Sequence, residues 1–185
     1  MTLTGSPPPA VLELDGFAWR EARPADAGTL DTLAAHASNR VLFNLPASTE
    51  EFLARVGRPG FRIAMLCTRD SKPIGAAATT QRNNRSLNLQ LLCFFAKAES
   101  ASLALAIYVR HIFWSLPMHR IYVQMPLVRG AESYVRLLES VGFVEEGVVS
   151  GHAKIDGRTY DVTALGILRR ELEAWCLQNE KRLAL

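Results

Sequence analysis

The sequence has few cysteines and no long apolar run. Its 185 residues include three cysteines, Cys67, Cys93 and Cys176, with no C-x-x-C pair and no histidine at zinc-ligand spacing. We therefore interpret them as buried or half-buried thiols and expect neither a disulfide framework nor a metal site. No stretch of 18 apolar residues occurs, and no basic segment precedes an apolar one at the N-terminus. These absences argue against secretion and membrane insertion, so we expect a cytoplasmic protein without a membrane partner.

The sequence also has no large excess of charge of one sign. Lys and Arg number 21 against 18 Asp and Glu, a net charge of +3, and the basic residues are scattered along the chain. Nucleic-acid-binding domains gather basic residues on one face, so we expect no nucleic-acid partner. Apolar residues make up 49% and charged residues 21%, which is typical of a folded globular protein. The length fits a single domain.

Composition divides the chain into three parts. Residues 1–16 begin with a segment rich in Pro, Gly and Ser, and we expect a flexible N-terminal arm there. Residues 17–170 carry the regular apolar patterns of one domain, and 171–185 are expected to form a C-terminal helix or tail. Leu172, Trp175 and Cys176 form an apolar stripe in that last part, which fits either a homodimer contact or a helix packed on the core.

Apolar periodicity and turn residues predict a mixture of helices and strands, with three consecutive strands joined by short turns. In chain order we expect strand 18–22, helix 24–37, a helix starting at Ser48, strands 61–68, 74–80 and 87–95, helix 101–116, strand 120–125, helix 131–141, and strands 143–149 and 159–168.

Several short motifs follow one another along this pattern. They are Trp-Arg-Glu-Ala-Arg-Pro-Ala-Asp at 19–26, Pro-Ile-Gly at 73–75, Leu-Pro-Met-His-Arg-Ile at 116–121, Leu-Leu-Glu-Ser-Val-Gly-Phe-Val-Glu-Glu-Gly at 137–147 and Asp-Gly-Arg-Thr-Tyr-Asp at 156–161. With them, residues 18–170 resemble the GNAT superfamily of N-acetyltransferases, and within it the branch of the ribosomal-protein alanine acetyltransferases. The resemblance implies the GNAT fold, an α/β (α+β) domain. Its mixed, mostly antiparallel seven-strand sheet is splayed between strands 4 and 5 and flanked by about four helices.

The resemblance also implies acetyl-CoA, or another acyl-CoA, as co-substrate. Its pantetheine arm would enter the cleft between the splayed strands, and a backbone N–H of Leu92, Cys93 or Phe94 would stabilise the oxyanion. Its pyrophosphate would lie at the N-terminus of the central helix, where N–H groups and the helix dipole favour anions. The residues expected to bind the co-substrate there are Lys97, Ser100, Ala101 and Ser102.

The phosphate-binding turn departs from the family pattern. In the family it reads approximately Arg/Gln-x-x-Gly-x-Gly/Ala, and here its first position falls on Ala96, its glycine on Glu99 and its last small residue on Ala101. A carboxylate beside a pyrophosphate costs Coulomb repulsion that a helix dipole does not cancel. Lys97 and the neighbouring serine hydroxyls offer compensation. We interpret the turn as a degenerate phosphate loop.

Two further family positions also lack their usual side chains. The Asn expected after the fifth strand falls on Ala131, and the Tyr that protonates the departing thiolate falls on Leu138. Tyr134 lies one helical turn earlier on the same face and is the nearest substitute, with a tyrosine packed beside the sheet as the alternative. His152 is the candidate base for the attacking amine, because imidazole ordinarily titrates near neutral pH. The alternative for His152 is an exposed turn residue.

Arg40, Phe43 and Asn44 fall in the region that shapes the acceptor pocket of relatives, so we predict them as substrate contacts. The acceptor is then a small-molecule or protein amine, and a protein N-terminus, an amino sugar and a small metabolite all stay open. Our first hypothesis is a GNAT-type N-acyltransferase. The second is a GNAT-fold protein that has lost the standard acetyl-CoA site and acts as a binding protein, or catalyses a different reaction in the same cleft.

Overall fold

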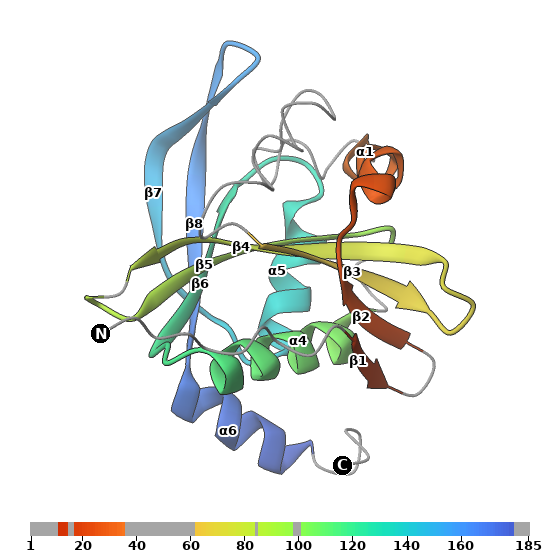
Figure 1. Ribbon diagram of the computed structural model, residues 1–185. Helices are drawn as coiled ribbons and strands as arrows, with labels where there is room; N and C mark the ends of the chain where they lie inside the picture. Colours follow the sequence, from red (N-terminus) through yellow and green to blue (C-terminus); the bar gives the residue numbers. More distant parts are fainter. Residues whose placement is uncertain (1–10, 15–16, 36–61, 84, 98–100, 180–185) are drawn as a thin grey trace.

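The computed structural model describes residues 11–14, 17–35, 62–83, 85–97 and 101–179, and these residues form one eight-stranded sheet with helices packed against it. The strand order is β1-β2-β3-β4-β5-β6-β8-β7, and β5 and β6 are its parallel pair (Figure 1). The strands are β1 (Val11–Leu14), β2 (Phe17–Glu21), β3 (Arg62–Thr68), β4 (Pro73–Asn83), β5 (Asn88–Phe95), β6 (Arg120–Pro126), β7 (Val144–Ile155) and β8 (Arg158–Leu168). The helices are η1 (Pro24–Asp26), α1 (Ala27–Ala35), α4 (Ser102–Ser115), α5 (Ala131–Ser140) and α6 (Arg169–Gln178).

The predicted fold class is confirmed. The seven expected strands are β2 to β8, and the expected divergence between the fourth and fifth of them lies between β5 and β6. The described residues contain four α-helices, and the helix expected from Ser48 lies outside them. No helix in the described part of the chain is long and apolar enough to cross a membrane.

The structure differs from the sequence predictions at two strands. Val11–Leu14, which we assigned to the flexible arm, form β1, because this apolar segment pairs antiparallel with the free edge of β2. Strand β7 continues to Ile155 instead of ending at Val149, because two register shifts absorb the extra residues and let the ladder with β8 resume at Ala153. The β7–β8 hairpin consequently extends well beyond the rest of the sheet (Figure 1).

Helices cover both faces of the sheet. In Figure 1, α1 lies on one side and α4 and α6 lie on the other. The fully buried side chains of the core come from the central strands and from α4 and α5; among them are Met65, Leu91, Phe94, Leu105, Ile121 and Leu138. Helix α4 ends where it does because Leu116, which precedes Pro117, takes an extended conformation (φ −128°, ψ 140°).

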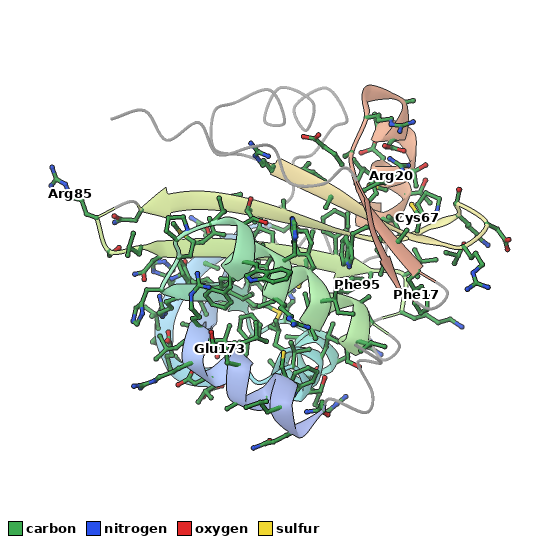
Figure 2. All side chains as sticks on the ribbon, turned by 60° about the horizontal axis from the view of Figure 1, so that its bottom comes forward. Phe17, Arg20, Cys67, Arg85, Phe95 and Glu173 are labelled. Atoms are coloured by element: carbon green, nitrogen blue, oxygen red, sulfur yellow. The ribbon has the colours of Figure 1, made fainter. Side chains whose placement is uncertain are left out.

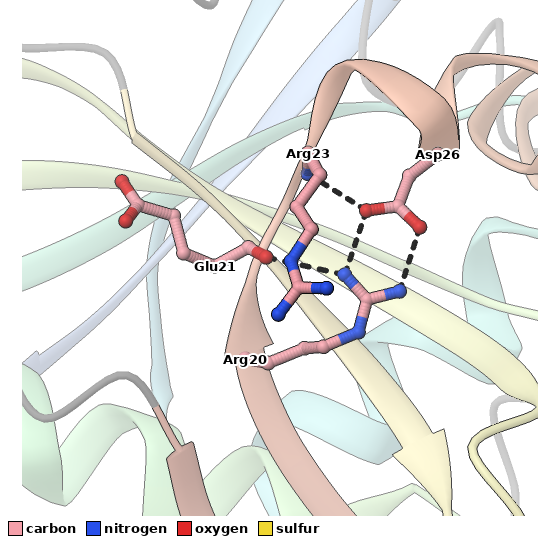
Figure 3. Close-up of polar contacts among 4 residues, drawn as sticks. All are labelled: Arg20, Glu21, Arg23 and Asp26. Carbon is pink, nitrogen blue, oxygen red and sulfur yellow. Dashed lines mark hydrogen bonds and ion pairs between the residues drawn. The ribbon is translucent and has the colours of Figure 1, made fainter.

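An ion pair fixes the end of β2 to the first helical turn (Figure 3). Both guanidinium Nη atoms of Arg20 donate to the two carboxylate oxygens of Asp26 at 2.6 Å, and the backbone N–H of Arg23 donates to Asp26 Oδ2 at 2.7 Å. The hydrogen bonds from Arg20 hold the pKa of the Asp26 carboxyl below its ordinary value. Asp26 therefore closes the turn between β2 and α1, which places α1 over β4 and β5.

Candidate active site at the diverging strands

Strands β5 and β6 separate soon after they meet. They are paired at three positions, Asn88 with Arg120, Leu89 with Ile121 and Gln90 with Tyr122, whereas β5 continues to Phe95. The second half of β5 therefore runs past the end of the parallel ladder. Such a divergence places one row of peptide groups outside the parallel ladder, where a bound molecule can take the place of the strand.

Hydrogen bonds on both sides of β5 show which peptide groups face β6. The N–H of Ala96 donates to the carbonyl of Ile74 at 2.9 Å, so Ala96 and the alternate residues Leu92 and Phe94 direct their peptide groups toward β4. Of the three predicted oxyanion donors, Leu92 and Phe94 thus direct their N–H groups toward β4 and away from β6. Their N–H groups belong to the ladder with β4.

The intervening residues of β5 face the other way. The carbonyl of Leu87 accepts a hydrogen bond from the N–H of His119 at 2.7 Å, at the start of β6. By the same alternation, the peptide groups of Cys93 and Phe95 face β6, beyond the last paired residue, Gln90. Cys93 is the one predicted donor with this orientation, and Phe95 is a residue that sequence reasoning missed.

The peptide group of Phe95 meets the hydroxyl of Tyr134. The N–H of Phe95 donates to Tyr134 Oη at 2.9 Å, and the hydroxyl lies 3.3 Å from the Phe95 carbonyl oxygen, to which it donates. Tyr134 belongs to α5 and is 4% exposed. It shares the buried face of α5 with Ala131 and Leu138, as the helical spacing predicted.

The Phe95 ring packs between Trp19 and the backbone of Gly75. Its centroid lies 6.4 Å from that of Trp19, edge to face, and Trp19 stacks on Tyr108 at 4.6 Å. Trp19 Nε1–H donates to the carbonyl of Ala104 at 2.8 Å, which joins β2 to α4. On the strand side, a Cβ added to Gly75 would come within 2.3 Å of Phe95 Cδ1, so only glycine leaves room for the ring. Figure 2 shows Phe95 beside β2, far from Arg85 at the other end of the β4–β5 hairpin.

Helix α4 begins close to the end of β5 in sequence. Its N-cap residue, Ala101, is buried and makes no side-chain capping hydrogen bond, and the first turn contains no acidic residue. Ser102 is half-buried and Lys97 is exposed, whereas Ser100 lies outside the described residues. The dipole of α4 favours a bound anion at this N-terminus, while Glu99, whose carboxylate is expected to oppose one, lies outside the described residues.

Three further side chains, Cys93, His111 and His152, carry groups that could take part in catalysis. Burial raises the pKa of the Cys93 thiol to about 12, which makes it an inert core group. Burial also lowers the pKa of His111 in α4. His152 lies exposed in β7, and the sheet order places β6 and β8 between its strand and β5. The structure thus brings Tyr134 to β5 but shows no contact between Tyr134 and His152, whose role stays a prediction.

The predicted acceptor contacts Arg40, Phe43 and Asn44 lie outside the described residues. Within the described ranges, no three His, Cys, Asp or Glu side chains form a group that could hold a metal ion. We take the β5 peptide row, Tyr134 and the N-terminus of α4 as the candidate site.

Comparisons with known proteins agree with this architecture. No protein family model and no curated protein matches the sequence. Solved structures do match: a crystal structure described as a provisionally assigned acetyltransferase has a TM-score of 0.77 and 19% identity over 95% of this chain and 97% of its own. The spermidine N-acetyltransferase from Vibrio cholerae, in complex with CoA and spermine, has a TM-score of 0.74 and 19% identity over 86% and 99%. At this identity the likeness establishes the fold, so the chain has the GNAT fold that these acetyltransferases share.

Proposed function

We propose that this protein transfers an acyl group from a CoA thioester to an amine. The observation that carries the proposal is the divergence of β5 from β6, which leaves the peptide groups of Cys93 and Phe95 facing away from β4; helix α4 follows β5 closely in sequence. An extended donor can bind such a strand edge, and its phosphates can bind the helix N-terminus. The fold shared with acetyltransferases, one of them in complex with CoA, supports the same conclusion.

The reaction needs few protein groups. The amine nitrogen attacks the thioester carbonyl carbon, the C–S bond breaks, the amine loses one proton and the thiolate gains one. The N–H of Cys93, which faces the opening from a fully buried residue, is our candidate for stabilising the developing oxyanion. Lys97, Ala101 and Ser102 are our candidates for holding the CoA phosphates, with Lys97 supplying the positive charge.

The acceptor is proposed to be a small-molecule amine. Spermine is bound in the structure of the Vibrio cholerae enzyme, and that supports an amine acceptor for this chain. We retain His152, which lies exposed on β7, as the candidate base that the resemblance suggested. A His152→Gln variant should lower kcat/KM while acetyl-CoA affinity stays unchanged.

The test is release of free CoA from acetyl-CoA in the presence of an amine panel that includes polyamines, amino sugars and peptides with free N-termini. We expect amine-dependent thiol release. Lys97→Ala should raise the KM for acetyl-CoA, whereas the matched variant Lys154→Ala, which removes an equal charge from β7, should not. No turnover with any amine, together with no acetyl-CoA binding, would refute the proposal in favour of a GNAT-fold protein that has lost this site.

A further inference from the structure

The Tyr134 hydroxyl lies on the part of β5 that the proposed donor would use. It accepts a hydrogen bond from the Phe95 N–H at 2.9 Å and donates one to the Phe95 carbonyl oxygen, the donor and acceptor that face away from β4 at the end of the strand. We propose that Tyr134 stands in for the acyl donor on β5 and that the donor binds by displacing this hydroxyl. The inference rests on the proposed acyltransferase function and adds the residue that controls entry to its site.

A pantetheine amide and a tyrosine hydroxyl can make the same kinds of hydrogen bond to the Phe95 peptide group. A pantetheine arm is a linear chain with amide groups, and each amide offers one N–H donor and one C=O acceptor to a strand edge. A phenol hydroxyl offers one donor and one acceptor as well. Before an acyl donor binds, the Tyr134 hydroxyl thus takes the place that a β6 peptide group would have beside Phe95. This one side chain hydrogen-bonds both the N–H and the carbonyl oxygen of Phe95.

Burial prevents the Tyr134 hydroxyl and the acyl donor from binding the Phe95 peptide group at the same time. Tyr134 is 4% exposed and Phe95 is 3% exposed, so little room exists for a second molecule beside this contact. The Phe95 N–H also carries a single hydrogen, which cannot make a full-strength bond to two acceptors. An amide of the acyl donor can therefore hydrogen-bond to Phe95 only if the Tyr134 hydroxyl moves.

The contrast with Tyr108 separates this arrangement from ordinary core packing. Tyr108 is also buried and stacks on Trp19, yet its hydroxyl makes no hydrogen bond to any described residue. Tyr134 instead directs its hydroxyl to the peptide group of Phe95, beyond the end of the parallel β5–β6 ladder. Its hydroxyl hydrogen is directed at Phe95, so protonation of a departing thiolate would also require this bond to break first.

The experiment measures acetyl-CoA affinity by isothermal titration in the wild type, in Tyr134→Phe and in the matched control Tyr108→Phe. Losing the competing hydroxyl should tighten acetyl-CoA binding by about 3- to 10-fold in Tyr134→Phe, the range that one neutral hydrogen bond gives. Tyr108→Phe should leave the affinity unchanged. Tyr134→Ala, which removes the ring as well as the hydroxyl, serves as the second variant.

Amide hydrogen exchange at Phe95 supplies a readout that does not depend on acetyl-CoA. The Phe95 amide should exchange faster in Tyr134→Phe than in the wild type, while the Ala96 amide, which donates to Ile74, should be unchanged. Unchanged affinity in a Tyr134→Phe protein whose wild type binds acetyl-CoA would overturn the inference and leave the proposed function standing. A lack of binding in the wild type and in Tyr134→Ala would overturn both.

Discussion

Replacing Gly75 by alanine should disturb the candidate site through one defined collision. The new Cβ would lie 2.3 Å from Cδ1 and 3.0 Å from Cε1 of the Phe95 ring, closer than any normal contact. The ring is 3% exposed and packs against Trp19, so it cannot turn outward without leaving the core. The backbone of Phe95, which carries the Tyr134 contact, is therefore expected to shift with the ring.

The size of the effect follows from two opposing contributions. Overpacking a close-packed core costs about 1 to 3 kcal/mol. Replacing glycine by alanine reduces the entropy of the unfolded chain, which raises the unfolding free energy by about 0.4 to 1 kcal/mol. The net loss of unfolding free energy should be about 1 to 2 kcal/mol, which lowers Tm by about 2 to 8 °C in a domain of this length.

Gly28→Ala is the matched control. Gly28 lies exposed in α1, and a Cβ added there meets no atom within 4 Å, so alanine should raise the unfolding free energy by about 0.5 to 1 kcal/mol. Urea denaturation of both variants measures the difference. Adding Phe95→Leu to Gly75→Ala should recover part of the loss, because the smaller side chain makes room for the Cβ. A Gly75→Ala protein as stable as Gly28→Ala would refute the reasoning.

Three further predictions follow from individual side chains. Tyr134→Phe should lower the unfolding free energy by about 1 to 3 kcal/mol, because it removes the partner of a buried N–H, whereas Tyr108→Phe should change it by less than about 0.5 kcal/mol in urea denaturation. The pKa of Asp26 is lower in the folded than in the unfolded chain, so its contribution to stability is complete above its ordinary pKa of 3.8 and is lost as the pH falls below it; Asp26→Asn should flatten the acid side of the stability profile measured by urea denaturation. At pH 8, a thiol reagent should modify the half-buried Cys176 in the native protein and leave Cys93 unmodified until the protein unfolds, as peptide mapping will show.

Most helix and strand limits were predictable from the sequence because their signals are local, whereas the sheet topology was expected from the family resemblance. Alternating apolar residues, the turn at 69–73 and Pro117 after a helical pattern set most element limits within a few residues. The exceptions depend on distant partners. Val11–Leu14 form a strand because β2 offers a free edge, and β7 continues past Val149 because β8 re-pairs with it beyond the register shifts.

The site was less predictable because it depends on strand register. The hydrogen bonds of Ile74 and Leu87 show, by alternation along β5, which of Leu92, Cys93 and Phe94 directs its peptide group toward β6. No sequence pattern tells which alternate residues these are. The helical spacing did place Tyr134 on the buried face of α5. The hydrogen bond from Phe95 to Tyr134 joins residues 39 apart in sequence, and only the packed structure shows it.

The most direct test of the account is titration calorimetry of the wild-type protein with acetyl-CoA at moderate salt, with free CoA and a longer acyl-CoA for comparison. The account predicts a dissociation constant of about 1 to 100 µM, corresponding to about −8 to −5.5 kcal/mol. Absence of binding heat and of any thermal shift up to millimolar acetyl-CoA would contradict the central claim that the diverging strands form a thioester site.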